Sequence, residues 1–255
     1  MKTATLGLLL GLAALAPMAG RAQAVRAVTE TSAYVAMDGP KVAGPATEVV
    51  ERTLRDAGIG DFKVGIYPWA RAYDMALTEP NVLIYLIART PEREKQFQWV
   101  GELLQVRYFL YKLKQRAEVA APTLDAARGY VIGVMRDDTR HQYLKKQGFS
   151  RLVVSARAGE NFLQLVNRQV DLVPLSEAGA ASQCAAAAFD CANLEKLLPL
   201  EEANSGLYMA YSHNTAPALV ARTQAAFEVL RANGTVRRLM EPKPPVGKTV
   251  SLNGK

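Results

Sequence analysis

The alternation of short apolar runs with amphipathic stretches is the sequence feature that most constrains the fold of this chain. A first series reads strand, helix, strand, helix, strand over residues 25–28, 46–57, 62–67, 69–77 and 82–87. A second series repeats this order over residues 130–135, 138–147, 152–154, 159–168 and 170–175. Strands that alternate with helices favour a parallel sheet with helices on both faces. The sequence therefore predicts an α/β protein built from two similar units.

Two extended segments connect these units. In residues 106–114 the side chains at 108, 110 and 112 alternate with those at 109, 111 and 113, which predicts one extended strand that crosses between the units. Residues 207–212 predict a strand that returns. A last helix is expected over 217–232. Two lobes joined in this way predict a hinged clamshell whose cleft encloses a small ligand. Lobe one would comprise residues 25–107 plus 210–255 and lobe two residues 108–209, each a sheet with flanking helices.

The first 24 residues have the pattern of a cleavable signal peptide. Lys2 supplies a positive start, residues 6–16 form an apolar stretch, and residues 22–24 read Ala-Gln-Ala, the small-x-small pattern that signal peptidase cleaves. The apolar stretch is shorter than the roughly 20 residues that span a bilayer. The alternative, a buried N-terminal helix, would need a polar face that residues 6–16 lack. We therefore expect the mature chain to be exported.

The two cysteines fit an exported protein. Cys184 and Cys191 are separated by six residues and would lie in an oxidising compartment, which favours a disulfide that closes a short local loop. Metal binding is the weaker alternative, because His141 and His213 are distant from each other and provide no zinc-ligand spacing. No metal or cofactor is predicted.

The charge balance argues against nucleic acid as a partner. The formal net charge is +7, but two of the basic residues lie in the signal segment and no run of five like charges occurs anywhere. An excess spread in this way indicates a mildly basic surface rather than a binding stripe.

A candidate carboxylate site follows the apolar run at residues 82–87. Thr90 suits a helix N-cap, Pro91 suits the first helical turn, and Arg93 would then stand at the third helical position. A helix N-terminus beside an arginine offers backbone N–H groups and a planar cation to a carboxylate. The alternative is a simple capped helix in which Arg93 faces solvent or pairs with Glu92.

Two aromatic residues and a second arginine are candidates for the pocket wall. Tyr34 lies in the loop after the first strand, and Trp69 opens a helix just beyond a strand, so that either ring could provide a flat apolar surface. Arg71 lies close to the same mouth and would add positive charge. The alternatives are a core tryptophan and a solvated helix arginine.

Residues 90–101, which read TPEREKQFQWVG, resemble the Thr-x-x-Arg-x-x-x-Phe segment of the family 3 bacterial extracellular solute-binding proteins. These are the periplasmic binding proteins of amino-acid uptake systems. The likeness continues in YPWARA at 67–72, YVIGV at 130–134 and NRQVDLV at 167–173, and covers most of the mature chain. The resemblance implies a two-lobed periplasmic protein in which Arg93 grips the ligand's α-carboxylate with Thr90 beside it.

The chain departs from this family in lobe two. Family members that bind amino acids usually carry an acid that holds the α-ammonium group, and here Glu177 is the candidate replacement, displaced by one residue. The Gly-Thr-Thr-like turn of the family is replaced by residues 136–139, which places Asp138 and Thr139 opposite lobe one. An amino acid is the first expectation for the ligand. A dicarboxylate, a small peptide and another amine-bearing acid are the alternatives.

Enzyme motifs are missing from the sequence. It has no Gly-x-Ser-x-Gly elbow, no His-Glu-x-x-His helix and no phosphate-binding glycine loop. We therefore expect a monomeric binding protein that closes on a small carboxylate-bearing ligand and delivers it to an ABC transporter. The alternatives are a ligand-binding sensor without a permease and a cleft dehydratase of small carboxylic acids that uses Glu177 or Asp138.

Overall fold

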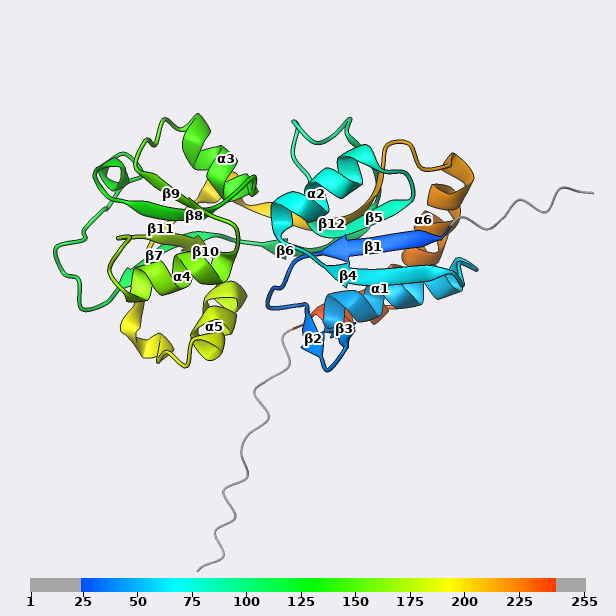
Figure 1. Cartoon of the computed structure of the whole chain (residues 1–255), viewed down its shortest axis with the longest axis horizontal. Coiled ribbons are helices and arrows are strands. Elements are labelled where there is room, and N and C mark those ends of the chain that lie inside the picture. Colours follow the sequence, from blue (N-terminus) through cyan, green and yellow to red (C-terminus); the bar gives the residue numbers. More distant parts are fainter. Residues whose placement is uncertain (1–23, 242–255) are drawn as a thin grey trace, which may run out of the picture.

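The computed structural model describes residues 24–241, which form two lobes side by side (Figure 1). The predicted signal peptide, residues 1–24, lies almost entirely outside the described residues. Among the helices that are described, none combines the length and the apolar character needed to cross a bilayer.

Lobe one is built on a five-stranded sheet with the order β4-β1-β5-β12-β6. Its strands are β1 (Val25–Thr29), β4 (Phe62–Ile66), β5 (Val82–Ala88), β6 (Phe97–Val106) and β12 (Ser205–Ser212). The prediction of parallel strands is correct for β4, β1 and β5. Strand β12, the predicted return strand, runs antiparallel to both β5 and β6. The reason is that β12 returns from lobe two and inserts between them.

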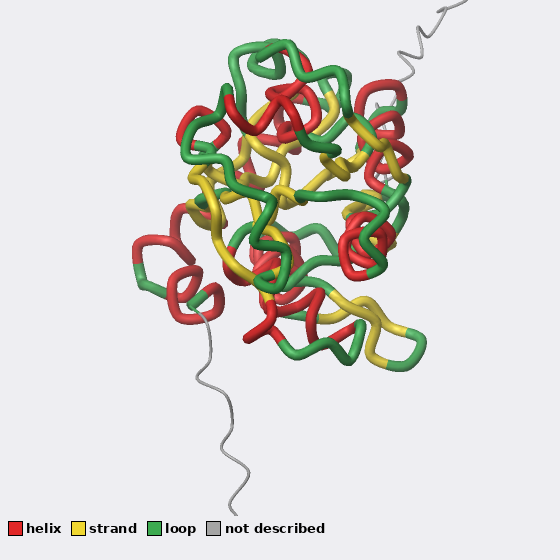
Figure 2. The backbone as a smooth tube through the Cα atoms, turned by 90° about the vertical axis from the view of Figure 1, so that its left-hand side faces the viewer, coloured by secondary structure: helices red, strands yellow, loops and turns green. Residues whose placement is uncertain are grey.

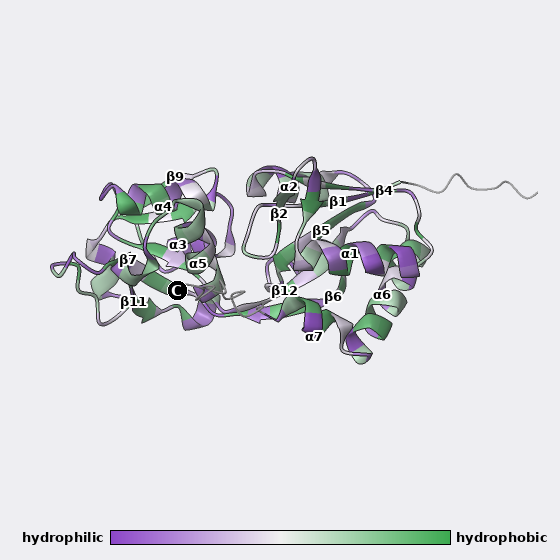
Figure 3. Ribbon diagram, turned by 90° about the horizontal axis from the view of Figure 1, so that it is seen from below, coloured by the Kyte–Doolittle hydropathy of each residue, from purple (hydrophilic) through white to green (hydrophobic). Residues whose placement is uncertain are grey.

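Helices cover both faces of this sheet. The helices α1 (Pro45–Asp56), α6 (Pro217–Ala232) and α7 (Thr235–Met240) pack on one face, where Tyr85 points, and α2 (Trp69–Thr78) packs on the other, where Ile84 points. In Figure 3 much of the strand surface is hydrophobic, whereas α1 alternates between hydrophilic and hydrophobic residues. Burial of these amphipathic helices on the apolar strands stabilises the lobe.

Lobe two contains smaller sheets with helices mostly on the outside (Figure 2). Its strands are β7 (Phe109–Leu113), β8 (Ile132–Met135), β9 (Leu152–Ser155), β10 (Val173–Leu175) and β11 (Leu194–Pro199), and its helices are α3 (Thr139–Lys146), α4 (Ala158–Val166) and α5 (Glu177–Ala186). The pair β8–β9 is parallel, as predicted. Leu172, directly before β10, forms a parallel bridge with Ile132 of β8, and β10 itself pairs antiparallel with β7, which also pairs with β11.

Short elements complete the fold: the hairpin β2 (Ala36–Asp38) and β3 (Lys41–Ala43), and the 3-10 turns η1 (Ala126–Gly129), η2 (Cys191–Asn193) and η3 (Glu201–Ala203). The predicted disulfide is present between Cys184 in α5 and Cys191 in η2. It joins the C-terminal half of α5 to the turn that precedes β11.

The prediction of one strand over 106–114 is wrong. Strand β6 ends at Val106 and β7 begins at Phe109. The backbone of Tyr108, between them, bonds to the returning chain: its N–H donates to Asn204 Oδ1 at 2.8 Å and its carbonyl accepts from the Leu200 N–H at 2.8 Å. The two segments that cross between the lobes are therefore hydrogen-bonded to each other, because the backbone groups of Tyr108 find partners in the return segment.

The prediction of a helix starting at Thr90 is also wrong. Residues 91–96 form turns, in which the Arg93 N–H donates to the Thr90 carbonyl and the Gln96 N–H donates to the Arg93 carbonyl, each at 3.0 Å. The chain then enters β6 at Phe97 and pairs with β12 through to Val106, the last residue of β6. Pairing with a strand from a distant part of the sequence overrides the local helical signal.

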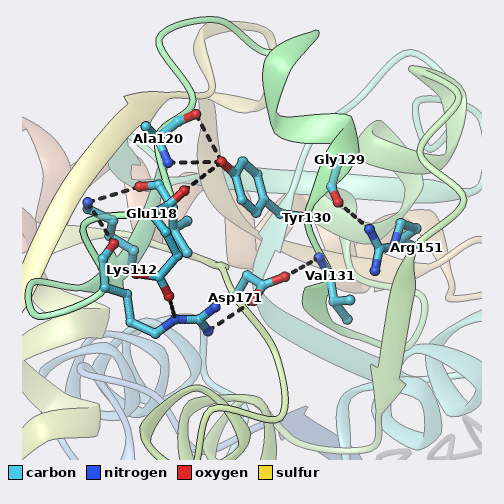
Figure 4. Close-up of polar contacts among 10 residues, drawn as sticks. Lys112, Glu118, Ala120, Gly129, Tyr130, Val131, Arg151 and Asp171 are labelled. Atoms are coloured by element: carbon cyan, nitrogen blue, oxygen red, sulfur yellow. Dashed lines mark hydrogen bonds and ion pairs between the residues drawn. The ribbon is translucent and has the colours of Figure 1, made fainter.

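Buried and half-buried polar groups hold the long loop of lobe two, residues 114–131 between β7 and β8 (Figure 4). Lys112 is buried, with 5% of the residue exposed, and its ammonium group donates to the carbonyls of Arg116 and Val119 at 3.2 and 2.9 Å. Asp171 pairs with the Arg116 guanidinium at 2.9 Å and accepts from the Val131 N–H at 2.7 Å. These contacts anchor the loop at both of its ends, away from the space between the lobes.

Candidate functional site

A cavity lies between the lobes and receives residues from both. From lobe one it is lined by the loop 29–34 after β1, by Trp69 at the start of α2, and by the end of β5 with Arg93 beyond it. From lobe two it is lined by the first residues of α3 and by α5. The loops at the carboxyl ends of parallel strands form ligand sites in many α/β proteins, and β1 and β5 end at this cavity.

Lobe two presents two helix N-termini to the cavity. The Asp138 carboxylate caps α3 by accepting from the Arg140 N–H at 2.8 Å, and the Ser176 hydroxyl caps α5 by accepting from the Gly179 N–H at 3.1 Å. Asp138, Ser176 and Gly179 all line the cavity. The partial positive charge at such ends favours an anion. Sequence reasoning placed the helix N-terminus at Thr90 in lobe one, whereas the structure provides two in lobe two.

Arg93 is the most deeply buried cation of the described residues, with 2% of its surface exposed. Its Nη1 donates to the Ala88 carbonyl at 3.3 Å and its Nη2 donates to the Asp137 carbonyl at 3.1 Å. The guanidinium stacks over Tyr73, 4.8 Å from the ring centroid. Its Nε has no hydrogen-bond partner within the described part of the chain. A buried cation with a spare donor is costly unless an anion approaches it.

Asp138 and Arg140 form a buried ion pair on the opposite wall. Arg140 Nε donates to Asp138 Oδ1 at 2.5 Å, and Arg140 Nη1 donates to the Pro174 carbonyl at 3.0 Å. Burial pushes the pKa of Asp138 upward, but the Arg140 guanidinium, aided by Arg93, more than offsets it and leaves the Asp138 pKa below its usual value. Asp138 therefore stays ionised and compensates part of the positive charge.

Glu30, which follows β1 directly, is a cavity residue that sequence reasoning missed. Burial, reinforced by the nearby Asp138 carboxylate and opposed by Arg140, raises the pKa of Glu30 to about 8. Burial also raises the pKa of the neighbouring Tyr34. The position of Glu30 at the carboxyl end of a predicted parallel strand was a usable signal.

The lobes contact each other at the Asp137 carbonyl. This single oxygen of lobe two accepts from Arg93 Nη2 and from Trp69 Nε1, the latter at 3.0 Å, and both donors belong to lobe one. Met135, at the end of β8, is buried in the lobe-one cluster around Trp69. Asp137 has a φ of 57°, a left-handed conformation that presents its carbonyl to both donors.

Five of the predicted site residues line the cavity: Tyr34, Trp69, Arg93, Asp138 and Thr139. Three lie elsewhere. Thr90 lines a neighbouring groove between the lobes that also contains Arg93. Arg71 stacks on Tyr67, 5.2 Å from the ring centroid. Glu177 forms a hydrogen-bonded ion pair with Lys196 on the surface, which lowers the pKa of Glu177.

The lining of the cavity combines buried cations, helix N-termini, carboxylates and aromatic rings. Within residues 24–241 no three His, Cys, Asp or Glu side chains gather in a way that could hold a metal ion. The arrangement can hold a small polar ligand between two lobes.

No protein-family model matches the sequence, and no curated protein matches it either. Solved structures do match the fold. A histidine kinase sensor domain with similarity to periplasmic binding proteins aligns with a TM-score of 0.76 and 17% identity, over 86% of this chain and 95% of that one. An ancestral arginine-binding protein bound to arginine aligns with a TM-score of 0.72 and 16% identity, over 87% of this chain and 97% of that one.

The chain has the two-lobed fold of the periplasmic binding proteins. A third similar structure is a periplasmic His/Glu/Gln/Arg/opine family-binding protein from Silicibacter pomeroyi in complex with lysine, with a TM-score of 0.69 and 16% identity over 85% of this chain and 94% of that one. These three neighbours include two proteins bound to amino acids and one sensor domain. At such identities the likeness concerns the fold, and the ligand has to be argued from the cavity itself.

Proposed function

We propose that this protein binds a small carboxylate-bearing ligand, an amino acid in the first instance, in the cavity between its lobes. The observation that carries the proposal is the buried Arg93 guanidinium, whose Nε lacks a partner in the described part of the chain while the residue lines the cavity. A ligand carboxylate would satisfy this donor and offset its charge, which is the role that the family resemblance implies for Arg93.

The remaining lining supports a ligand that also carries an ammonium group. The helix N-termini at Asp138 and Ser176 would add their partial positive charge to that of Arg93, and Thr139 follows in the first turn of α3. Two acids line the cavity, Glu30 and Asp138, whereas Glu177 lies at the surface, and of these two Asp138 is already paired with Arg140. An ammonium group beside Glu30 would favour its ionised form and would cause a proton to be released on binding. Tyr34 and Trp69 provide the apolar walls.

Closure between two lobes suits a protein that presents its ligand to another protein. We propose that residues 1–24 direct export to the periplasm, that the mature protein is a monomer, and that it delivers its ligand to an ABC transporter. The similarity to a histidine kinase sensor domain supports a second role, in which the closed protein reports its ligand to a receptor without transport. The presence or absence of a permease gene beside this one would separate the two roles.

The experiment is a thermal-shift screen of the mature chain against amino acids, small dicarboxylates and short peptides, followed by calorimetry. A ligand at a hundredfold excess over its dissociation constant should stabilise the protein by about 2.7 kcal/mol. The variant Arg93→Ala should lose this shift. Arg89→Ala is the matched control, because Arg89 is an exposed arginine whose ion pair with Glu94 lies outside the cavity.

Two results would contradict the proposal. One is that Arg93→Ala binds the best ligand with the same dissociation constant as wild type. The other is the absence of a shift with every compound, combined with mass spectra in which no small molecule accompanies the purified protein. Since Arg93 also contacts lobe two, the melting temperature of Arg93→Ala without ligand has to be measured, so that a loss of folding is not mistaken for a loss of binding.

A further inference from the structure

Leu86 has an unusual backbone conformation in the middle of a central strand. Its φ is 61°, in the left-handed region that steric crowding disfavours for a leucine. It is also the only residue of β5 that is partly exposed, since the other six residues of this strand are buried. Backbone strain of this kind persists where the surrounding structure holds it in place, and it is concentrated at functional sites.

A β-bulge explains the conformation. In the antiparallel pair of β12 with β5, Tyr208 is opposite Ile87 and the next residue, Met209, is opposite Tyr85, so that Leu86 is the extra residue. An extra residue reverses the alternation of side chains along a strand. Ile84 and Ile87 consequently both belong to the cluster beneath α2, whereas Leu86 and Ala88 face the opposite side.

The bulge points Leu86 into the cavity. Leu86 and Ala88 both line it, and three further apolar residues from other elements join them: Val106, Leu175 and Leu207. The carbonyl of Ala88 also accepts a hydrogen bond from Arg93 at 3.3 Å. The C-terminal end of β5 therefore carries apolar side chains and also a carbonyl that holds Arg93, the cation proposed to bind the ligand carboxylate.

We propose that Leu86 is a specificity-determining residue, which receives the apolar part of a ligand whose carboxylate is held by Arg93. The inference rests on the proposed function and narrows its ligand class to small carboxylates with an aliphatic side chain. A second charged group placed against Leu86 would be desolvated without a partner, which disfavours ligands with a charged side chain. Each methylene added against this surface should tighten binding about fourfold.

The test measures dissociation constants by calorimetry for L-alanine, L-valine, L-leucine, L-asparagine, L-glutamate and L-arginine. L-Leucine and L-asparagine have nearly the same shape and differ in polarity, so their affinity ratio reports on the surface at Leu86. Wild type should prefer L-leucine by about tenfold or more. In Leu86→Asn the ratio should fall at least fivefold, because asparagine tolerates a positive φ and keeps the shape but is polar.

Ala188→Gly is the matched control. Ala188 also has a positive φ, of 49°, but it is exposed in lobe two and does not line the cavity. Relief of strain there should leave the L-leucine to L-asparagine ratio unchanged. Circular dichroism of Leu86→Asn establishes that it is folded, and Leu86→Ala provides a second, apolar truncation that should weaken L-leucine binding more than L-alanine binding.

The outcomes separate this inference from the proposed function. If wild type binds L-asparagine, L-glutamate or L-arginine more tightly than L-leucine, or if both Leu86 variants keep the wild-type ratios, the role of Leu86 is refuted and the proposed function stands. If no compound of the panel binds wild type and none of the broader screen does, both fail together.

Discussion

Loss of the indole hydrogen bond between the lobes should open the protein measurably. Trp69 Nε1 donates to the Asp137 carbonyl at 3.0 Å, and Trp69→Phe removes this donor while it keeps an aromatic ring in the cluster with Met135. A neutral hydrogen bond contributes about 1 kcal/mol net. The Asp137 carbonyl keeps its second donor, Arg93, so no acceptor is left without a partner. The open-to-closed ratio should therefore rise about fivefold.

The assay is a pulsed electron-spin measurement of the distance between two nitroxide labels. Lys63 in β4 of lobe one and Lys145 in α3 of lobe two are exposed and suit labelling, and the native cysteines are already bonded to each other. The protein is unfolded and refolded beforehand to remove any retained ligand. In Trp69→Phe the fraction of long distances should increase relative to the parent protein.

Trp99→Phe is the matched control for this prediction. Trp99 Nε1 also donates to a backbone carbonyl, that of Glu94 at 3.1 Å, but both residues lie in lobe one. The same substitution there should leave the distance distribution unchanged. Identical distributions in the parent, Trp69→Phe and Trp99→Phe would refute the reasoning that this bond holds the lobes together.

Two further predictions concern pH and the disulfide. The pKa of Glu30 is raised from 4.5 to about 8 in the folded protein, so between these values the unfolded chain ionises first and the folded state loses stability as the pH rises. The residue that replaces it in Glu30→Gln does not titrate. The melting temperature of Glu30→Gln minus that of wild type should therefore be larger at pH 8 than at pH 5, and the same value of this difference at both pH values would contradict the prediction. Replacing Cys184 and Cys191 by alanine should lower the free energy of unfolding by roughly 2 kcal/mol, measured by urea denaturation, because the bond restricts the unfolded chain. Equal urea midpoints with and without the bond would refute that estimate.

Much of the fold was predictable from the local pattern. The periodicity of apolar residues located both strand–helix series, and most helix bounds agree with the structure within a few residues, as for α6 at Pro217–Ala232. These elements were predictable because their amphipathic faces and the residues that end them lie within a short stretch of sequence. The disulfide was predictable for the same reason, since its cysteines are close in the chain.

The turn after β5 and the break between β6 and β7 were predicted incorrectly because their partners are distant in sequence. Residues 90–96 carry the signals of a helix start, but β6 then pairs with β12, whose residues 205–212 lie far along the chain from residues 97–106 of β6. Tyr108 interrupts the crossing segment because Leu200 and Asn204 bond its backbone. Neither pairing can be recognised from the local periodicity of apolar residues.

The chain's own sequence determined the α/β class, the two units and the identity of Arg93, Asp138 and Tyr34 as candidates. Only the tertiary structure decided that Glu30 faces the cavity, that Glu177 pairs with Lys196 outside it, and that a bulge turns Leu86 toward it. The physical reason is one of range. Amphipathic periodicity is a property of neighbouring residues, whereas the direction of a side chain near a cleft depends on strand register and on charges contributed by distant segments.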